Sequence, residues 1–225
     1  MKQNYFPEVA IKGRVRVCLE TLTSIDLKNK YIVDVGSSIG WLEEKLLGYK
    51  LRKLVGVEPD AVAVAYAQKK VRRACFIQSS ATKIPLPSGI ADIVVMFDVL
   101  EHVPKNRERN ALEEANRILK QHGRLVLSTP NNHILTNLLD PAWYFSHRHY
   151  RRLSLKSLLR RAGFKVEKFE IRGGLWSSAN LIWHYFMKWI LKKPLAVNKF
   201  LERKDDQEFS KKTGIHTIFL IASKI

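Results

Sequence analysis

Two glycines and a later acidic residue have the spacing of a nucleotide-binding turn. The run Tyr31–Gly40 has the apolar residues of a buried strand, followed by a turn that contains Gly36 and Gly40. Glu58 ends the next apolar run. In a doubly wound α/β fold, such a turn cradles a nucleotide, and a carboxylate at the end of the second strand binds its ribose. These residues predict a nucleotide-like ligand at one edge of a sheet.

The glycine spacing indicates which ligand this is. A dinucleotide fingerprint that starts at Gly36 needs glycines at positions 38 and 41, where this chain has Ser38 and Trp41. Without those glycines the backbone cannot approach a pyrophosphate closely, and Trp41 obstructs tight packing of the helix. The pattern Asp34-x-Gly36-x-x-x-Gly40 suits a cofactor with a ribose and a small carboxylate but no phosphate. S-adenosylmethionine (SAM) has that chemistry.

The length and composition are typical of one folded domain. The 225 residues are 46% apolar and 27% charged, which allows a substantial buried core. Cys18 and Cys75 do not have the spacing of a disulfide framework or a metal site. The chain shows no export signal. We therefore expect a cytoplasmic protein, with peripheral contact to the inner membrane surface as an extension of that expectation.

The charge is strongly positive. Thirty-nine Lys and Arg residues against 21 Asp and Glu residues give a net charge of +18. This excess predicts attraction to a polyanion, either a nucleic acid or an anionic membrane surface, and does not choose between them.

Strands and helices alternate along the chain, which predicts an α/β fold with a parallel sheet and helices on both faces. We treat 1–225 as a single domain, in which a helical segment (1–28) precedes the first strand and an apolar helical insertion (172–214) separates the last two. The predicted strands are 31–35, 53–58, 74–78, 91–97, 124–128, 164–171 and 215–222, and the predicted helices between them are 39–48, 61–70, 107–120 and 154–162.

Five motifs in order resemble class I SAM-dependent methyltransferases, and most of all the branch that contains quinone-biosynthesis methyltransferases. The resemblance covers about residues 31 to 171. It implies a Rossmann-like, three-layer αβα fold whose seven-stranded sheet has an antiparallel last strand inserted beside the sixth. The motifs are Asp34-x-Gly36-x-x-x-Gly40, Val57-Glu58-Pro59-Asp60, Asp98-Val-Leu-Glu-His-Val103, Gly123-Arg-Leu-Val-Leu-Ser-Thr-Pro-Asn131 and Arg161-Ala-Gly-Phe164.

The resemblance also implies which residues hold the cofactor. The glycines let the backbone pass the methionine moiety, amides from Ser38 onward face its carboxylate, and Asp34 lies beneath. Glu58 accepts both ribose hydroxyls, and Ser80 stands where the family usually has an acidic residue for the adenine amino group. The residues assigned to the cofactor are Asp34, Gly36, Ser37, Ser38, Gly40, Glu58, Pro59, Ser80, Ala81, Phe97 and Asp98.

His102 is the candidate catalytic residue, as a general base for a substrate hydroxyl. One alternative makes Asp98, Glu101 and His102 ligands of a divalent metal. Another makes Glu101 the partner of a nearby cation and His102 a packing residue under the cofactor loop. Because SAM carries an activated methyl group, positioning alone supplies much of the acceleration. We assign His102 as the base and predict no metal.

The loop after the fifth strand is expected to bind the acceptor, because the family keeps its substrate determinants there. A run of basic residues follows over 147–165. It reads equally as an anion site or as a solvated helix face. The residues assigned to the acceptor are Asn131, Asn132, His133, Tyr144, His147 and His149.

The segment 181–192 predicts a helix with an unusually broad apolar arc. Asn180, His184, Lys188 and Lys192 recur every fourth residue and form one narrow polar stripe. An arc this broad exceeds what a surface helix normally buries. We expect a lid, a homodimer contact or a peripheral membrane contact.

Three functions follow from these features. The first is a SAM-dependent methyltransferase acting on a small-molecule or lipid-like acceptor, with a membrane surface as its place of action. The second is an RNA methyltransferase that uses the basic surface. The third is a non-catalytic SAM-binding protein, against which the intact glycines and Glu58 count.

Overall fold

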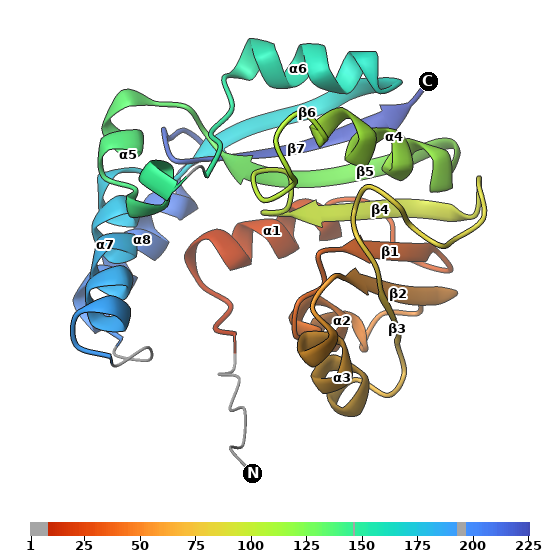
Figure 1. The fold of residues 1–225 in the computed structure, drawn as a ribbon, viewed down its shortest axis with the longest axis horizontal. Coiled ribbons are helices and arrows are strands. Elements are labelled where there is room, and N and C mark those ends of the chain that lie inside the picture. The colour runs from red at the N-terminus through yellow and green to blue at the C-terminus, as the bar shows by residue number, and fades with distance from the viewer. Residues whose placement is uncertain (1–8, 146, 193–196) are drawn as a thin grey trace.

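A computed structural model describes residues 9–145, 147–192 and 197–225, which contain a seven-stranded mixed sheet (Figure 1). Its strands are β1 (Tyr31–Val35), β2 (Lys53–Glu58), β3 (Cys75–Gln78), β4 (Ala91–Phe97), β5 (Leu119–Pro130), β6 (Phe164–Arg172) and β7 (Thr217–Lys224). The spatial order is β3-β2-β1-β4-β5-β7-β6. Strands β1 to β5 pair in parallel, and β7 lies antiparallel between β5 and β6. This topology confirms the predicted Rossmann-like sheet.

Helices cover both faces of the sheet, because alternate residues of each strand point to opposite sides. The covering helices are α1 (Gly13–Thr23), α2 (Trp41–Leu46), α3 (Ala61–Lys70), α4 (Glu108–Ile118) and α6 (Arg152–Arg161). Val33 of β1 packs in a cluster with Leu112 of α4 and Leu155 of α6. Ile32 of the same strand packs in the opposite cluster with Leu42 of α2. This alternation produces the expected three layers (Figure 1).

The main boundary error in the prediction lies at the start of β5. The helix predicted over 107–120 ends at Ile118, because Leu119 already pairs with Ala91 of β4. The strand predicted over 124–128 is longer for the same reason. Both Ile118 and Leu119 are fully buried. Apolar periodicity cannot distinguish the last turn of a buried helix from the first residues of a buried strand.

The insertion between β6 and β7 is a pair of helices that pack on each other, α7 (Leu175–Trp189) and α8 (Lys199–Ser210). Helix α7 begins earlier than the predicted apolar segment, and α8 was not predicted. Two short elements fill the loop after β5, α5 (Ile134–Leu138) and η1 (Pro141–Phe145). Helix α5 contacts α7, and both lie at one end of the molecule (Figure 1). Within the described ranges, no helix is long and apolar enough to cross a membrane.

The predicted polar stripe of α7 is only partly exposed. Asn180 is buried, and its Nδ2 donates a hydrogen bond to Asp205 Oδ2 of α8 at 3.1 Å. His184 is exposed, whereas the side chain of Lys188 lies outside the described part of the structure. Helix α7 therefore turns some of its polar side chains inward, because α8 offers acidic partners.

Acidic side chains of α8 bind the first turns of two other helices. Asp206 Oδ1 accepts a hydrogen bond from the Gly13 backbone N–H at 2.7 Å, and Glu208 Oε2 accepts one from the Ser177 backbone N–H at 3.0 Å. The first amides of a helix have no partner within the helix and carry partial positive charge, so carboxylates are favourable there. The insertion thus holds α1 against the sheet.

Candidate cofactor and acceptor sites

A cavity of about 480 Å³ lies where β1, β2 and β4 end, at the carboxyl edge of the sheet. Clefts at this edge are the usual ligand sites of open α/β sheets, and this volume lies in the ordinary range for a small ligand. We call it the cofactor cavity. It is lined by Val9, Arg14, Val15, Cys18, Gly36, Ser38, Ile39, Trp41, Glu58, Pro59, Phe97, Asp98, Val99 and His102.

The turn after β1 requires glycine at both of its predicted positions. Gly36 has φ +84°, and a Cβ there would lie 2.3 Å from Val99 Cγ2. Gly40 has φ +74°, and its Cβ would lie 2.9 Å from Phe76 Cζ. Gly36 lines the cofactor cavity. Gly40 does not line it and instead packs closely against Phe76. The conformation and the close approaches explain why the chain needs glycine here.

Glu58 is oriented by backbone donors at the end of β2. Its Oε2 accepts a hydrogen bond from the Ser38 N–H at 3.0 Å, and its Oε1 accepts one from the Asp60 N–H at 3.1 Å. Ser38 has φ +48°, a conformation that few non-glycine residues adopt and that functional sites often contain. The Ser38 amide of the turn and the candidate ribose acceptor Glu58 therefore meet at the wall of the cofactor cavity.

Two buried carboxyl groups lie beneath the turn. Burial raises the pKa of Asp34 to about 7, and burial together with Asp34 raises the pKa of Glu43 well above its ordinary range. Neither oxygen of Glu43 has a hydrogen-bond partner, and Ser37 Oγ is likewise buried without one. Asp34 and Ser37 therefore support the turn and do not line the cofactor cavity. Sequence reasoning missed Glu43, because an acidic residue in a first helical turn ordinarily faces solvent.

Asp98 is fixed at the end of β4 by two partners. Its Oδ1 accepts a hydrogen bond from Ser128 Oγ at 2.9 Å, and its Oδ2 lies 3.1 Å from Arg14 Nε. Asp98 also has φ +54°. Ser128 of β5 and Arg14 of α1 therefore set the direction of this carboxylate. Arg14 was not predicted, because nothing in its local sequence links it to β4.

A second cavity, of about 170 Å³, adjoins the first and shares Arg14, Asp98 and His102 with it. We call it the acceptor cavity. A larger cavity of about 680 Å³ shares Glu101, His102, His147 and His149 with the acceptor cavity. The acceptor cavity is lined by Arg14, Asp98, Glu101, His102, Pro130, Thr136, Asp140, His147, His149, Leu181, Tyr185 and His216.

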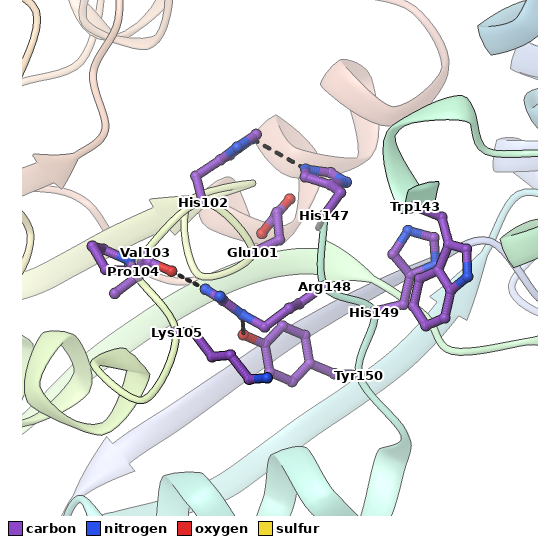
Figure 2. A pocket seen from close by; sticks show the side chains of 10 residues that line it. All are labelled: Glu101, His102, Val103, Pro104, Lys105, Trp143, His147, Arg148, His149 and Tyr150. Carbon is purple, nitrogen blue, oxygen red and sulfur yellow. Dashed lines mark hydrogen bonds between the residues drawn. The ribbon is translucent and has the colours of Figure 1, made fainter. Parts of the chain in front are cut away.

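Glu101 and His102 have different environments although they are neighbours in the chain. Glu101 is 2% exposed, and burial raises its pKa to about 8. Its Oε2 accepts a hydrogen bond from Thr129 Oγ1 at 3.0 Å, and its Oε1 has no partner. His102 is exposed, and its Nε2 lies 3.3 Å from His147 Nε2 (Figure 2). Burial of part of the ring, followed by the nearby His147, lowers the pKa of His102.

Comparison with known proteins places this site in a family. The model of the methyltransferase domain family matches residues 10–168, which span the glycine turn, Glu58 and the end of β4. The chain belongs to the SAM-dependent methyltransferase family. Its cofactor is therefore SAM, as the glycine spacing predicts. Assignment to the quinone-biosynthesis branch stays a prediction.

Individual relatives agree with this family. A Mycobacterium tuberculosis protein named as a probable SAM-dependent methyltransferase is 31% identical over 134 residues, which are 59% of this chain and 48% of that protein. A Mycolicibacterium smegmatis protein with a matching name is 28% identical over 137 residues, 60% of this chain and 52% of that protein. The chain thus spans about half the length of the curated relatives it matches.

A solved structure shows the fold alone. Geranyl diphosphate C-methyltransferase from Streptomyces coelicolor, in complex with Mg²⁺, geranyl diphosphate and S-adenosylhomocysteine, has a TM-score of 0.66 at 12% identity. The match covers 93% of this chain and 79% of that one.

Ser80 and Ala81, which the methyltransferase resemblance assigns to the cofactor, do not line the cofactor cavity. Ser80 follows β3, is exposed, and its Oγ lies 3.0 Å from Thr82 Oγ1. Ala81 packs against the hydrophobic core. Neither side chain lines the cofactor cavity. Their assignment to the adenine stays a prediction of the family resemblance.

The predicted acceptor residues of this chain divide into two groups. His147 and His149 line the acceptor cavity. Asn131 is a structural residue, because its N–H and Nδ2 donate to backbone oxygens just before β7 at 2.8 Å each. The other three predicted residues do not line the acceptor cavity either, and they are Asn132, His133 and Tyr144.

The basic residues over 147–165 also fall into two groups, one structural and one exposed. Arg148 is structural, since its guanidinium lies 2.9 Å from Glu108 Oε1 and donates to the backbone oxygens of Leu100 and Val103. Arg151, which precedes α6, and the three arginines of that helix are exposed; the three are Arg152, Arg160 and Arg161. Helix α6 contributes nothing to the lining of the acceptor cavity.

Proposed function

We propose that this methyltransferase transfers the methyl group of SAM to a small-molecule or lipid-like acceptor. The observation that carries the proposal is the shared wall of the two cavities, formed by Arg14, Asp98 and His102. A ligand in each cavity is thereby held against the same three side chains, and alignment of two reactants is worth several orders of magnitude in rate.

The residues of the cofactor cavity fit SAM. The turn at Gly36 has no room for a side chain, so the backbone can approach the ligand closely there. Glu58 is positioned to accept from ribose hydroxyls, and the half-buried Asp98 carboxylate suits the amino group of the methionine moiety. When bound, SAM supplies a methyl group already activated on a sulfonium sulfur.

His102 is the proposed base. It lines the cofactor cavity, the acceptor cavity and the larger cavity, so it reaches the wall at which the two ligands meet. The centroid of the adjacent His147 ring lies 4.6 Å from that of His102 (Figure 2). A positioned imidazole that takes a proton from an acceptor contributes about 10²–10⁴-fold to rate.

The lipid-like class is supported by helix α7. Its Leu181 and Tyr185 line the acceptor cavity. Ile182 and Phe186 of the same helix and Ile190, the residue that follows it, are exposed at intervals of one helical turn. We call these three residues the apolar stripe. Large exposed apolar patches mark interaction sites, and a helix with such a stripe suits a membrane interface.

An RNA acceptor is the second candidate, and the observation that favours it is the set of exposed arginines on α6. Incubation with methyl-labelled SAM and a host extract, followed by fractionation, separates the two. We expect label in the lipid or small-molecule fraction, and no label with Glu58→Ala. Label in RNA would replace the first candidate with the second. No labelled fraction for the wild type, with SAM binding intact, would favour the non-catalytic alternative.

A further inference from the structure

Three side chains of the loop after β5 converge on one point of the acceptor cavity. The Oδ2 atom of Asp140 lies 2.9 Å from His149 Nε2 and 3.7 Å from His147 Nδ1. One donor atom from each residue lies within 4.8 Å of the other two. The side chains are 8%, 18% and 3% exposed for Asp140, His147 and His149. The three residues form a shielded cluster of one carboxylate and two imidazoles.

The hydrogen bonds of His149 leave the lone pair of its Nε2 available to bind a cation in this cluster. His149 Nδ1 lies 2.6 Å from Asn137 Oδ1, and Asn137 Nδ2 donates to Asn132 Oδ1 at 3.0 Å. The Asn137 oxygen is therefore the acceptor, and His149 Nδ1 carries a proton. A neutral imidazole has only one N–H. Its Nε2 then directs a lone pair at the Asp140 carboxylate, and that contact requires a second proton or a metal ion between them.

The environment of His147 is a second, independent observation that favours a metal ion in this cluster. Its Nδ1 is inaccessible to solvent and has no hydrogen-bond partner. The 3.7 Å separation from Asp140 Oδ2 is too long for a hydrogen bond. Ligand atoms held about 2.0–2.1 Å from a tetrahedral Zn²⁺ ion lie about 3.3 Å from one another. The two separations in this cluster, 2.9 Å and 3.7 Å, fall on either side of that value.

We propose that Asp140 Oδ2, His147 Nδ1 and His149 Nε2 bind a divalent transition-metal ion of the Zn²⁺ type. Two imidazoles favour Zn²⁺ over Mg²⁺. Asn137 holds the other nitrogen of His149, as residues behind a metal-bound histidine commonly do. The ligands differ from the Asp98, Glu101 and His102 set considered from the sequence, because all three lie in the loop after β5. Asp140 lies between α5 and η1, and His147 and His149 follow η1.

The proposed site is open on one side. All three ligands line the acceptor cavity, and three protein ligands with a free position are typical of catalytic zinc sites. If the proposed methyl transfer is correct, an oxygen of the acceptor occupies that position, which favours a hydroxyl- or carboxylate-bearing compound. The metal site itself does not depend on that reaction.

The experiment measures Zn²⁺ binding to the full, tag-free, chelator-treated chain by calorimetry. We expect one Zn²⁺ ion per wild-type chain. His147→Ala, His149→Gln and Asp140→Asn each weaken binding by more than about a hundredfold, and Asn137→Ala weakens it by about 10–100-fold. His184→Gln, an exposed histidine of α7, binds as the wild type does.

SAM affinity and circular dichroism of the same variants report folding and the methyltransferase assignment separately. Added Zn²⁺ raises the melting temperature of the wild type and His184→Gln but not of the three ligand variants. The proposal would be overturned if the wild type did not bind Zn²⁺. It would also be overturned if a folded His149→Gln variant bound Zn²⁺ as tightly as the wild type does. In either case the contact between Asp140 and His149 is a hydrogen bond only.

Discussion

The guanidinium of Arg14 lies 3.1 Å from the carboxylate of Asp98, and this pair stands where the cofactor cavity meets the acceptor cavity. Arg14 belongs to the first helix of the described chain, and Asp98 follows the fourth strand. The pair therefore joins α1 to the carboxyl edge of the sheet. It links the covering helix α1 to the wall of the cofactor cavity.

Removing the Arg14 cation tests that coupling. Arg14→Gln is expected to change the free energy of unfolding by less than about 1 kcal/mol, because both side chains are partly solvent-exposed and water screens the pair. SAM affinity is expected to fall about tenfold, since Asp98 loses a partner that fixes its direction. Calorimetry and chemical denaturation of the same sample measure both. A loss of stability without a change in affinity would assign the pair to folding.

Asp206 of α8 is expected to stabilise α1 from the other side. Asp206→Ala removes the hydrogen bonds to the Gly13 N–H and to Arg16 Nε, which lie at 2.7 and 3.0 Å. We expect destabilisation of about 1–3 kcal/mol, typical of hydrogen bonds to charged groups, measured by urea denaturation. Glu113→Ala, a partly exposed acidic residue of α4 whose partner is Arg109 of the same helix, serves as the control. Equal stability of both variants would show that α8 does not hold α1.

The buried Asp34 predicts a fall in stability as pH rises. Its pKa is raised from 3.8 to about 7 by burial, so the folded chain holds a proton that the unfolded chain has lost over this range. The stabilisation is complete below about pH 4 and is lost towards pH 7, with a slope of up to about 1.4 kcal/mol per pH unit. Asp34→Asn should reduce the slope of unfolding free energy against pH, whereas Glu113→Gln should not; Glu43 and Glu101, whose pKa values are also raised, keep part of the slope. An unchanged slope in Asp34→Asn would contradict the assignment.

The apolar stripe predicts binding to anionic liposomes. Ile182 and Phe186 are 38% and 44% exposed, so inserting each into an interface contributes roughly 1 kcal/mol. Ile182→Ser plus Phe186→Ser should lower liposome affinity by roughly tenfold or more in a co-sedimentation assay. Leu153→Ser, on the exposed side of α6, is the matched control. Unchanged sedimentation of the double variant would exclude the stripe as an anchor, and a shift from dimer to monomer would identify a homodimer contact.

The sheet and the cofactor turn could be predicted from the sequence, because both depend on local patterns. Strands buried on both faces give continuous apolar runs, and the turn after β1 leaves a glycine signature wherever a side chain cannot fit. Helix α8 has no such signature. Its residues are mostly charged, and it is stable because Asp206 and Glu208 find the first amides of α1 and α7.

The acceptor site could be predicted only in part, because its geometry depends on a loop. His147 and His149 stand out as histidines, but Asp140 has no distinguishing neighbours in the sequence. Only the folded loop brings its carboxylate to 2.9 Å from His149. Asn131 shows the opposite error, since an asparagine after β5 suggests a substrate contact, yet its side chain bonds to the backbone of Ile215. Tertiary contacts decide both outcomes.

The most direct test of the account is SAM binding by Glu58→Ala, measured by calorimetry beside the wild type and the exposed-turn control Gly48→Asp. A Cβ at Gly48 meets nothing within 4 Å, so that control should bind SAM normally. Glu58→Ala should bind at least about a hundredfold more weakly and melt as the wild type does, since two hydrogen bonds from ribose hydroxyls to a carboxylate are lost. Wild-type affinity in Glu58→Ala would contradict the cofactor site described for this chain.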